Sequence, residues 1–175
     1  MKFKYLIILS IVFLQISCGT GMKIPSEQLQ GINSEFKGTF LNRSYKNQIK
    51  KGTNSNLEIL NLLNLTGKKS DSVSLSFTSE NELIVIYDNA LGKTKEYFKG
   101  EFSKKGYFEI FLSKKNIQIP PFFSTLYSKT DIQRVRINLT KENELIIDSY
   151  YDRSGNVFLF AAGSSGRSQY FFKPN

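Results

Sequence analysis

The sequence predicts an all-β fold of about eight antiparallel strands in two meanders, forming an up-and-down barrel or a strongly curved sheet, with one short helix. Apolar and polar residues alternate in 73–78 and again in 132–139, as in strands with one buried face. Short polar segments separate runs of similar length, as hairpins require. Eight such strands suffice to close a barrel, and an open curved sheet fits the pattern nearly as well.

The N-terminus predicts a signal peptide, residues 1–17. Lys2 and Lys4 supply a short positive region ahead of the apolar run 5–14. This run has the length of a signal h-region and is shorter than the roughly 20 residues that a transmembrane helix needs. We therefore expect the segment to direct export and to be removed.

Cys18 is the only cysteine and follows the signal segment directly. The residues before it resemble the lipobox of bacterial lipoproteins, with the small Ser17 in place and Gln15 where that family usually has Leu. The resemblance implies that Cys18 becomes an acylated N-terminus, carrying chains such as palmitate, and anchors the protein to a membrane. The alternative is that Cys18 is an ordinary thiol.

Three segments are expected: the signal 1–17, a lipidated flexible tether 18–35, and a single β domain 36–175. The tether is polar with Gly, Pro and Ser, a composition typical of linkers. Cleavage after residue 17 would leave 158 residues and lower the net charge from +9 to +7. A chain of that length can bury a core without disulfides.

The first half of the domain predicts a helix and a meander. Apolar spacing in 57–65 indicates a short helix, with Ser55 or Asn56 as its cap. The strands are expected at 73–78, 83–88, 95–102 and 107–112, with turns at Glu80-Asn81 and at 104–106.

The second half predicts another meander after the connection at Pro120 and Pro121, because proline cannot donate to a central ladder. The strands are expected at 132–139, 145–151, 156–162 and 168–173, with turns at Glu142-Asn143, at 152–156 and at 163–166. Residues 78–85 match 140–147 at an offset of 62. Shared hairpin chemistry explains this match better than internal duplication, which stays the alternative.

From the lipobox through Gly38-Thr39-Phe40 to the later strands, the chain resembles small lipocalin-like lipoproteins of Bacteroidetes-type bacteria. Lipocalins usually carry Gly-x-Trp on the first strand, covered by an arginine near the last. Here Phe40 replaces the tryptophan, and Arg167 is the candidate for the covering role. The resemblance implies a lipocalin-like barrel with a cavity for an apolar ligand.

Composition narrows the function classes. The basic residues are dispersed as pairs beside Gly, Asn or Ser, without a run of five, so nucleic acid is not expected as a partner. The sequence contains no histidine, which excludes Ser-His and Cys-His catalysis and histidine-ligated zinc. Asp148, Asp152 and Glu109 could supply a glycosidase-type carboxylate pair, although solvated strand positions explain them more simply. We expect no catalytic residue, cofactor or metal.

Residues 149–156 concentrate aromatic and charged side chains near a strand end. Tyr150 and Tyr151, with Arg167, are therefore the candidate ligand-facing residues, while a hairpin turn at 152–156 with packed tyrosines is the alternative.

Three functions remain open: a lipid-anchored envelope module that binds an apolar or amphipathic small molecule, a structural or assembly accessory that engages another envelope protein, and a carboxylate-dependent hydrolase. The first is preferred. A cavity would favour it, whereas a packed interior with an exposed aromatic patch would favour the second. Residues 19–26 contain no acid, so we expect an outer-membrane lipoprotein that faces the periplasm.

Overall fold

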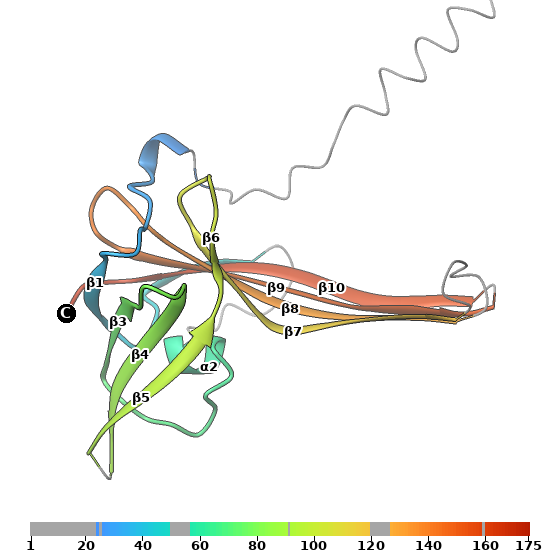
Figure 1. The fold of residues 1–175 in the computed structure, drawn as a ribbon, viewed down its shortest axis with the longest axis horizontal. Coiled ribbons are helices and arrows are strands. Elements are labelled where there is room, and N and C mark those ends of the chain that lie inside the picture. Colours follow the sequence, from blue (N-terminus) through green and yellow to red (C-terminus); the bar gives the residue numbers. More distant parts are fainter. Residues whose placement is uncertain (1–23, 25, 50–56, 91, 120–126, 159) are drawn as a thin grey trace, which may run out of the picture.

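The computed structural model describes residues 24, 26–49, 57–90, 92–119, 127–158 and 160–175, which form a mostly β fold with one short α-helix (Figure 1). The signal peptide, Cys18, the cap candidates Ser55 and Asn56, and both prolines of the connection lie outside these residues. The elements are η1 (Ser26–Gln28), β1 (Lys37–Leu41), β2 (Lys46–Ile49), α2 (Ile59–Leu62), β3 (Ser72–Phe77), β4 (Glu82–Asn89), β5 (Gly92–Lys99), β6 (Glu101–Phe102), β7 (Phe108–Ile119), β8 (Tyr127–Leu139), β9 (Leu145–Val157) and β10 (Phe160–Phe172).

The strands form two antiparallel sheets. One has four strands in the order β1-β3-β4-β5, and the other has six in the order β2-β10-β9-β8-β7-β6. Alternation decides which side chains face inward, so Val73, Leu75 and Phe77 of β3 are buried as predicted. The predicted turn at Glu80-Asn81 connects β3 to β4, and Asn81 adopts a left-handed φ of 59°.

The chain crosses between the sheets at Gly100. A β-carbon there would lie 2.5 Å from the carbonyl oxygen of Glu109, so only glycine fits. The predicted strand 95–102 is consequently divided between β5 and β6, which belong to different sheets.

At the other seam, the amide of Leu41 donates to the carbonyl of Lys173 at 3.0 Å. Within the described residues no ladder runs continuously from one sheet into the other, so the barrel that the sequence predicted is not found.

The space between the sheets is filled by apolar side chains. Phe77, Phe102 and Phe108 form one aromatic cluster, with ring centroids 4.7–5.0 Å apart. Helix α2 adds Ile59 and Leu60, both fully buried. The predicted helix is therefore confirmed in a shorter form.

Asn42 attaches α2 to the body of the fold. Its side-chain oxygen accepts from the amide of Leu60 at 3.2 Å, and its carbonyl accepts from the amide of Ile59 at 2.8 Å. These bonds satisfy two amides that the first turn of a helix leaves without partners.

The segment predicted as a tether joins the fold before Phe36. Leu29 bridges to Thr140, the amide of Lys141 donates to the carbonyl of Gln28, and Ile32 is buried in the core. Among the described helices, none has the length and apolar character to cross a membrane.

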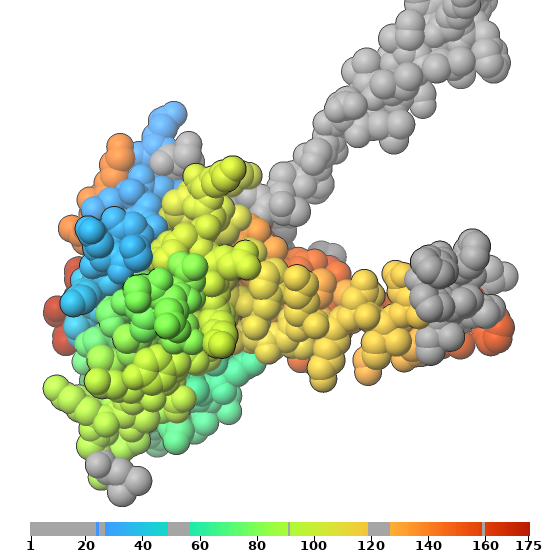
Figure 2. Space-filling model, viewed as in Figure 1, coloured from blue at the N-terminus to red at the C-terminus, as the bar shows by residue number. Residues whose placement is uncertain are grey.

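Beyond the two-sheet body, four strands continue outward as a long projection (Figures 1 and 2). We call this projection the arm and define it as residues 113–119, 127–134, 150–157 and 160–167. Eight residues of β8 extend about 26 Å at the usual rise of a strand. Among the described residues, the four-stranded sheet does not extend over the arm (Figure 1).

The arm corrects two predicted turns. Residues 152–156 and 163–166 are Gly- and Ser-rich but lie inside β9 and β10, which pair continuously from Phe160↔Val157 to Phe172↔Leu145. The glycines allow close packing here: a β-carbon on Gly155 would lie 2.5 Å from the Ser128 carbonyl oxygen. The predicted turn at Glu142-Asn143 is confirmed.

Candidate functional site

The outer face of the six-stranded sheet carries a charged cluster, next to the start of the arm. Its members alternate with core residues along their strands and share a face through cross-strand pairing. We define the charged cluster as Glu109, Arg134, Arg136, Asp148, Tyr150, Arg167 and Gln169.

Asp148 is the most buried member of the charged cluster, with no exposed surface. Its Oδ2 accepts from Arg167 Nη2 at 2.5 Å and Nε at 2.8 Å, and from Gln169 Nε2 at 3.0 Å. Oδ1 of Asp148 and Oε1 of Gln169 are buried without a hydrogen-bond partner. Two acceptor oxygens of this buried network are thus unsatisfied.

Glu109 binds the other two arginines of the cluster. Arg136 Nε donates to Glu109 Oε1 at 2.6 Å, and Arg134 Nε lies 3.4 Å from the same oxygen without forming a hydrogen bond. The guanidinium of Arg134 lies 5.0 Å from the ring centroid of Tyr150. Burial, together with the positive charge of Arg136, lowers the pKa of Arg134, while Glu109 opposes this shift.

The structure places two of the three ligand-facing candidates together. Tyr150 and Arg167 are cross-strand partners on the outer face, whereas Tyr151 points to the opposite face, against Gly166. Burial raises the pKa of Tyr150, and the neighbouring Asp152 carboxylate adds to this effect.

The three carboxylates proposed for hydrolysis have different partners. Asp148 and Glu109 are each held by arginines, and Asp152 lies 3.4 Å from the Tyr150 hydroxyl. Each carboxylate thus has its own partner among the described residues, an arrangement typical of a structural network. In the part of the chain that the structure describes, no group of three or more potential ligands could hold a metal ion.

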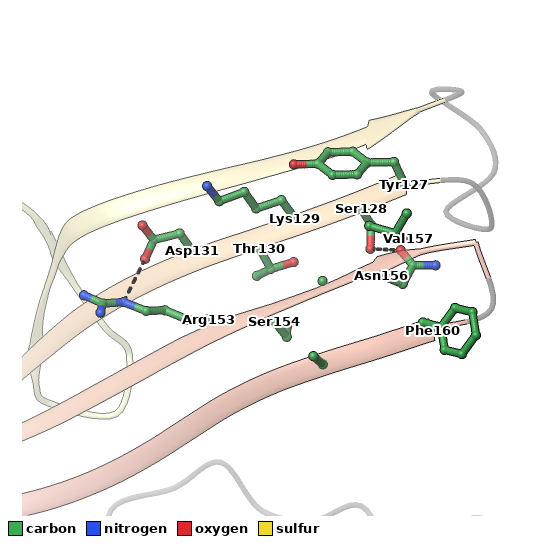
Figure 3. A pocket seen from close by; sticks show the side chains of 12 residues that line it. Tyr127, Ser128, Lys129, Thr130, Asp131, Arg153, Ser154, Asn156, Val157 and Phe160 are labelled. Carbon is green, nitrogen blue, oxygen red and sulfur yellow. Dashed lines mark hydrogen bonds and ion pairs between the residues drawn. The ribbon is translucent and has the colours of Figure 1, made fainter.

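The distal arm contains a shallow groove of about 700 Å³, drawn in Figure 3. Tyr127, Val157 and Phe160 line its outer end, because Val157 on β9 pairs with Tyr127 on β8 and with Phe160 on β10. Lys129 lies behind them, next to the small Gly155. The groove thus combines an apolar end with a cationic side chain, a combination that the sequence analysis did not identify.

The turn between β9 and β10 exposes large apolar side chains. Phe160 is 84% exposed and Phe158 is 63% exposed. Phe158 also has a left-handed φ of 53°, which is unfavourable for a bulky residue.

Within the described residues, one edge of the arm is open. Strand β2 pairs only with Ser168–Phe171 of β10, and no strand among the described residues pairs with the outer edge of residues 160–167. This edge carries small side chains from Ala161 to Gly166. The opposite edge, on β7, carries Lys114 and Lys115 instead.

Comparison of the chain with models of protein families, with curated proteins and with solved structures found no match. The lipocalin-like resemblance therefore stays a prediction. In the structure Phe40 stacks on Phe36 within the core, with centroids 6.2 Å apart, and Arg167 binds Asp148 on the outer face.

Proposed function

We propose that this chain is an accessory protein of the bacterial envelope, anchored through lipid on Cys18, that uses the arm to dock onto another envelope protein. The open edge of β10 is the observation that carries this proposal. The apolar space between the sheets is filled by side chains, which favours an external contact over a ligand held in the core.

The two edges of the arm differ in how well they are protected against pairing with a strand of another protein. Exposed edge strands are commonly protected by lysine, proline or bulges, since unpaired backbone groups otherwise recruit another strand. The β7 edge has Lys114, Lys115 and a register shift between Phe111 and Ser113. Residues 161–166 of β10 have no charge and no proline. An extended segment of a partner can therefore pair with β10 without displacing a large side chain.

Photo-cross-linking in native cells tests the proposal. A photoreactive residue at Ser164, on the open edge, should give a discrete adduct with one envelope protein. The same residue at Asn116, on the lysine-protected edge, is the matched control and should give no such adduct. Equal labelling from both positions would contradict strand addition at β10.

Proline variants sharpen the test. Successive N–H groups of a strand point to opposite sides, so of Ser164→Pro and Ser165→Pro one removes an outward N–H and the other breaks the β9 ladder. The variant that retains the wild-type melting temperature should lose the adduct. An adduct that persists in this folded variant would exclude backbone pairing at the edge.

The groove supports a second candidate, binding of an amphipathic small molecule. Its volume lies within the range of small-molecule sites, and it offers Lys129 beside the aromatic Tyr127 and Phe160. Native mass spectrometry of protein from its own membrane should then show added mass beyond the acylated chain. Lys129→Glu should remove that mass, and absence of any added mass in the wild type would count against this candidate.

A further inference from the structure

The turn between β9 and β10, at the end of the arm, differs from the other turns in the residue that adopts a left-handed φ. Asn64, Asn81 and Asn143 have left-handed φ values of 59–61°, and asparagine tolerates this conformation. Phe158 is the only other non-glycine residue with positive φ among those described. A large aromatic side chain thus occupies a backbone position that suits Asn or Gly.

The pairing at this turn makes the choice of residue more unusual. Val157 pairs with Phe160, so only two residues connect β9 to β10. Two-residue hairpin connections favour Asn-Gly or similar pairs, whereas this chain has Phe158-Leu159. Because Phe158 and Phe160 are mostly exposed, packing inside the protein does not explain them. Strain and exposed apolar surface at one turn together indicate a contact outside the chain.

Charge is graded along the arm. The sequence has no acidic residue between Lys115 and Asp131, and none after Asp152. Lys129 is two residues from Tyr127, so it lies about 7 Å from the end of the arm. Lys115 lies about 13 Å from the same end. The apolar end is therefore followed by Lys129, and the first acid, Asp131, lies farther back at the level of Lys115, where it binds Arg153 at 3.7 Å.

We propose that the end of the arm inserts into the interfacial layer of a bilayer that contains anionic phospholipid. The inserted side chains are Val157, Phe158 and Phe160, with Tyr127 at the level of the headgroups and Lys129 paired with lipid phosphate. Interfacial elements place apolar groups about 5–10 Å into the headgroup boundary, which matches the position of Lys129. Bilayer insertion fits a projecting end without acids better than a protein pocket does, because it needs no specific shape complement.

Tryptophan fluorescence tests the insertion directly, since the chain has no tryptophan of its own. Phe160→Trp places a probe at the end of the arm, and Tyr97→Trp places a matched probe on β5 of the body, where the side chain is 57% exposed. The full chain carries the same N-terminus in both variants, so a difference between the probes reports local insertion and not anchoring.

On vesicles of phosphatidylcholine and phosphatidylglycerol, the emission of the arm probe should shift to the blue and be quenched by brominated acyl chains. The emission of the body probe should stay unchanged. On pure phosphatidylcholine the shift should be smaller, since this zwitterionic surface has no net negative charge to attract Lys129. If both probes stay solvent-like on anionic vesicles, or both shift equally, insertion by the arm is refuted.

A second variant separates the contact from folding. Phe158→Asn relieves the strain of the left-handed backbone, so the melting temperature of this variant should not fall. When Phe158→Asn is combined with the Phe160→Trp probe, the blue shift should require at least about tenfold more anionic lipid, because apolar surface has been removed from the end of the arm. An unchanged lipid dependence would refute a role for Phe158. Quenching by brominated acyl chains reports lipid alone, so it can be observed whether or not strand addition at β10 occurs. A blue shift of the arm probe that appears only with the cross-linked partner protein, without this quenching, would instead assign this end to protein docking.

Discussion

Removing the carboxylate of Asp148 should strongly destabilise the fold, because Asp148 neutralises Arg167 within a buried network. Asp148 is fully buried, and it accepts two hydrogen bonds from the Arg167 guanidinium. Breaking a buried ion pair by removing one partner costs about 3–5 kcal/mol. We expect Asp148→Asn to cost about 3 kcal/mol, since the Arg167 side chain retains 16% exposure and can recover some hydration. Against a typical total of about 5–15 kcal/mol, this loss is large.

The double variant is the informative control. In Asp148→Leu with Arg167→Met, neither charge of the pair is left without its partner and the unsatisfied Oδ1 of Asp148 is removed, while Gln169 Nε2 loses its acceptor. Such replacements are often neutral or stabilising, so the double variant should be more stable than Asp148→Asn. The coupling between the two sites should reach about 2–3 kcal/mol.

Urea denaturation followed by circular dichroism gives the free energy of unfolding for the wild type, Asp148→Asn, the single variants Asp148→Leu and Arg167→Met, and the double variant that combines these last two. The slope of the transition must stay constant for the comparison to hold. If each single substitution costs less than about 1 kcal/mol and the effects add, the pair behaves as an exposed ion pair and the reasoning from burial is wrong.

Three further predictions concern other parts of the chain. Desolvation, the hydrogen bond to Glu144 and the negative charge of Glu144 raise the pKa of Tyr45 to about 12, so the folded state favours the neutral phenol. The stabilisation from this shift is present below pH 10 and should be lost between pH 10 and 12, so the melting temperature should decline over this range. Tyr45→Phe should flatten this decline. Phe158→Asn should raise the free energy of unfolding by about 0.5–1 kcal/mol by relieving left-handed strain, measured in urea, and a loss would show that Phe158 packs usefully. The wild type should fractionate with membranes and Cys18→Ala should not mature normally, and unlipidated, soluble wild-type protein would contradict lipidation.

The body of the fold could be predicted because one face of each strand is buried. In 73–78 the residues alternate strictly between serine or threonine and a large apolar side chain, and the structure buries that apolar face. The turns at Asn81 and Asn143 could also be predicted from local sequence, because asparagine tolerates the left-handed backbone that both turns adopt.

The arm could not be predicted by the same reasoning. Among the described residues, the four-stranded sheet covers neither face of the arm, and the alternation that marks a half-buried strand is absent from residues 160–167. In the sequence Gly163 and Gly166 indicate a turn, whereas in the structure they leave room for Ser154 and Tyr151 on the neighbouring strand. That requirement depends on a strand far away in the sequence, and no local pattern reports it.

Only part of the charged cluster could be predicted from the sequence. Arg134 and Arg136 alternate with core residues, which identified a polar sheet face. Their partner Glu109 lies on another strand, and Asp148 and Arg167 meet only because β9 and β10 pair in one register. Register in such a sheet is fixed by burial of the opposite face, a property of the whole fold.

The energetics of the arm explain why a contact at its edge or end matters for the arm itself. Ordering each residue costs about 1–2 kcal/mol, while a backbone hydrogen bond returns only about 1 kcal/mol net. The body compensates this cost by burying apolar surface between two sheets, but the arm has exposed side chains such as Phe160 and Ile117 instead. The distal strands are therefore held chiefly by their own ladder and by pairs such as Asp131 with Arg153. A strand added to β10, or a bilayer around the turn, would supply the missing burial, so binding and ordering of the arm should be coupled.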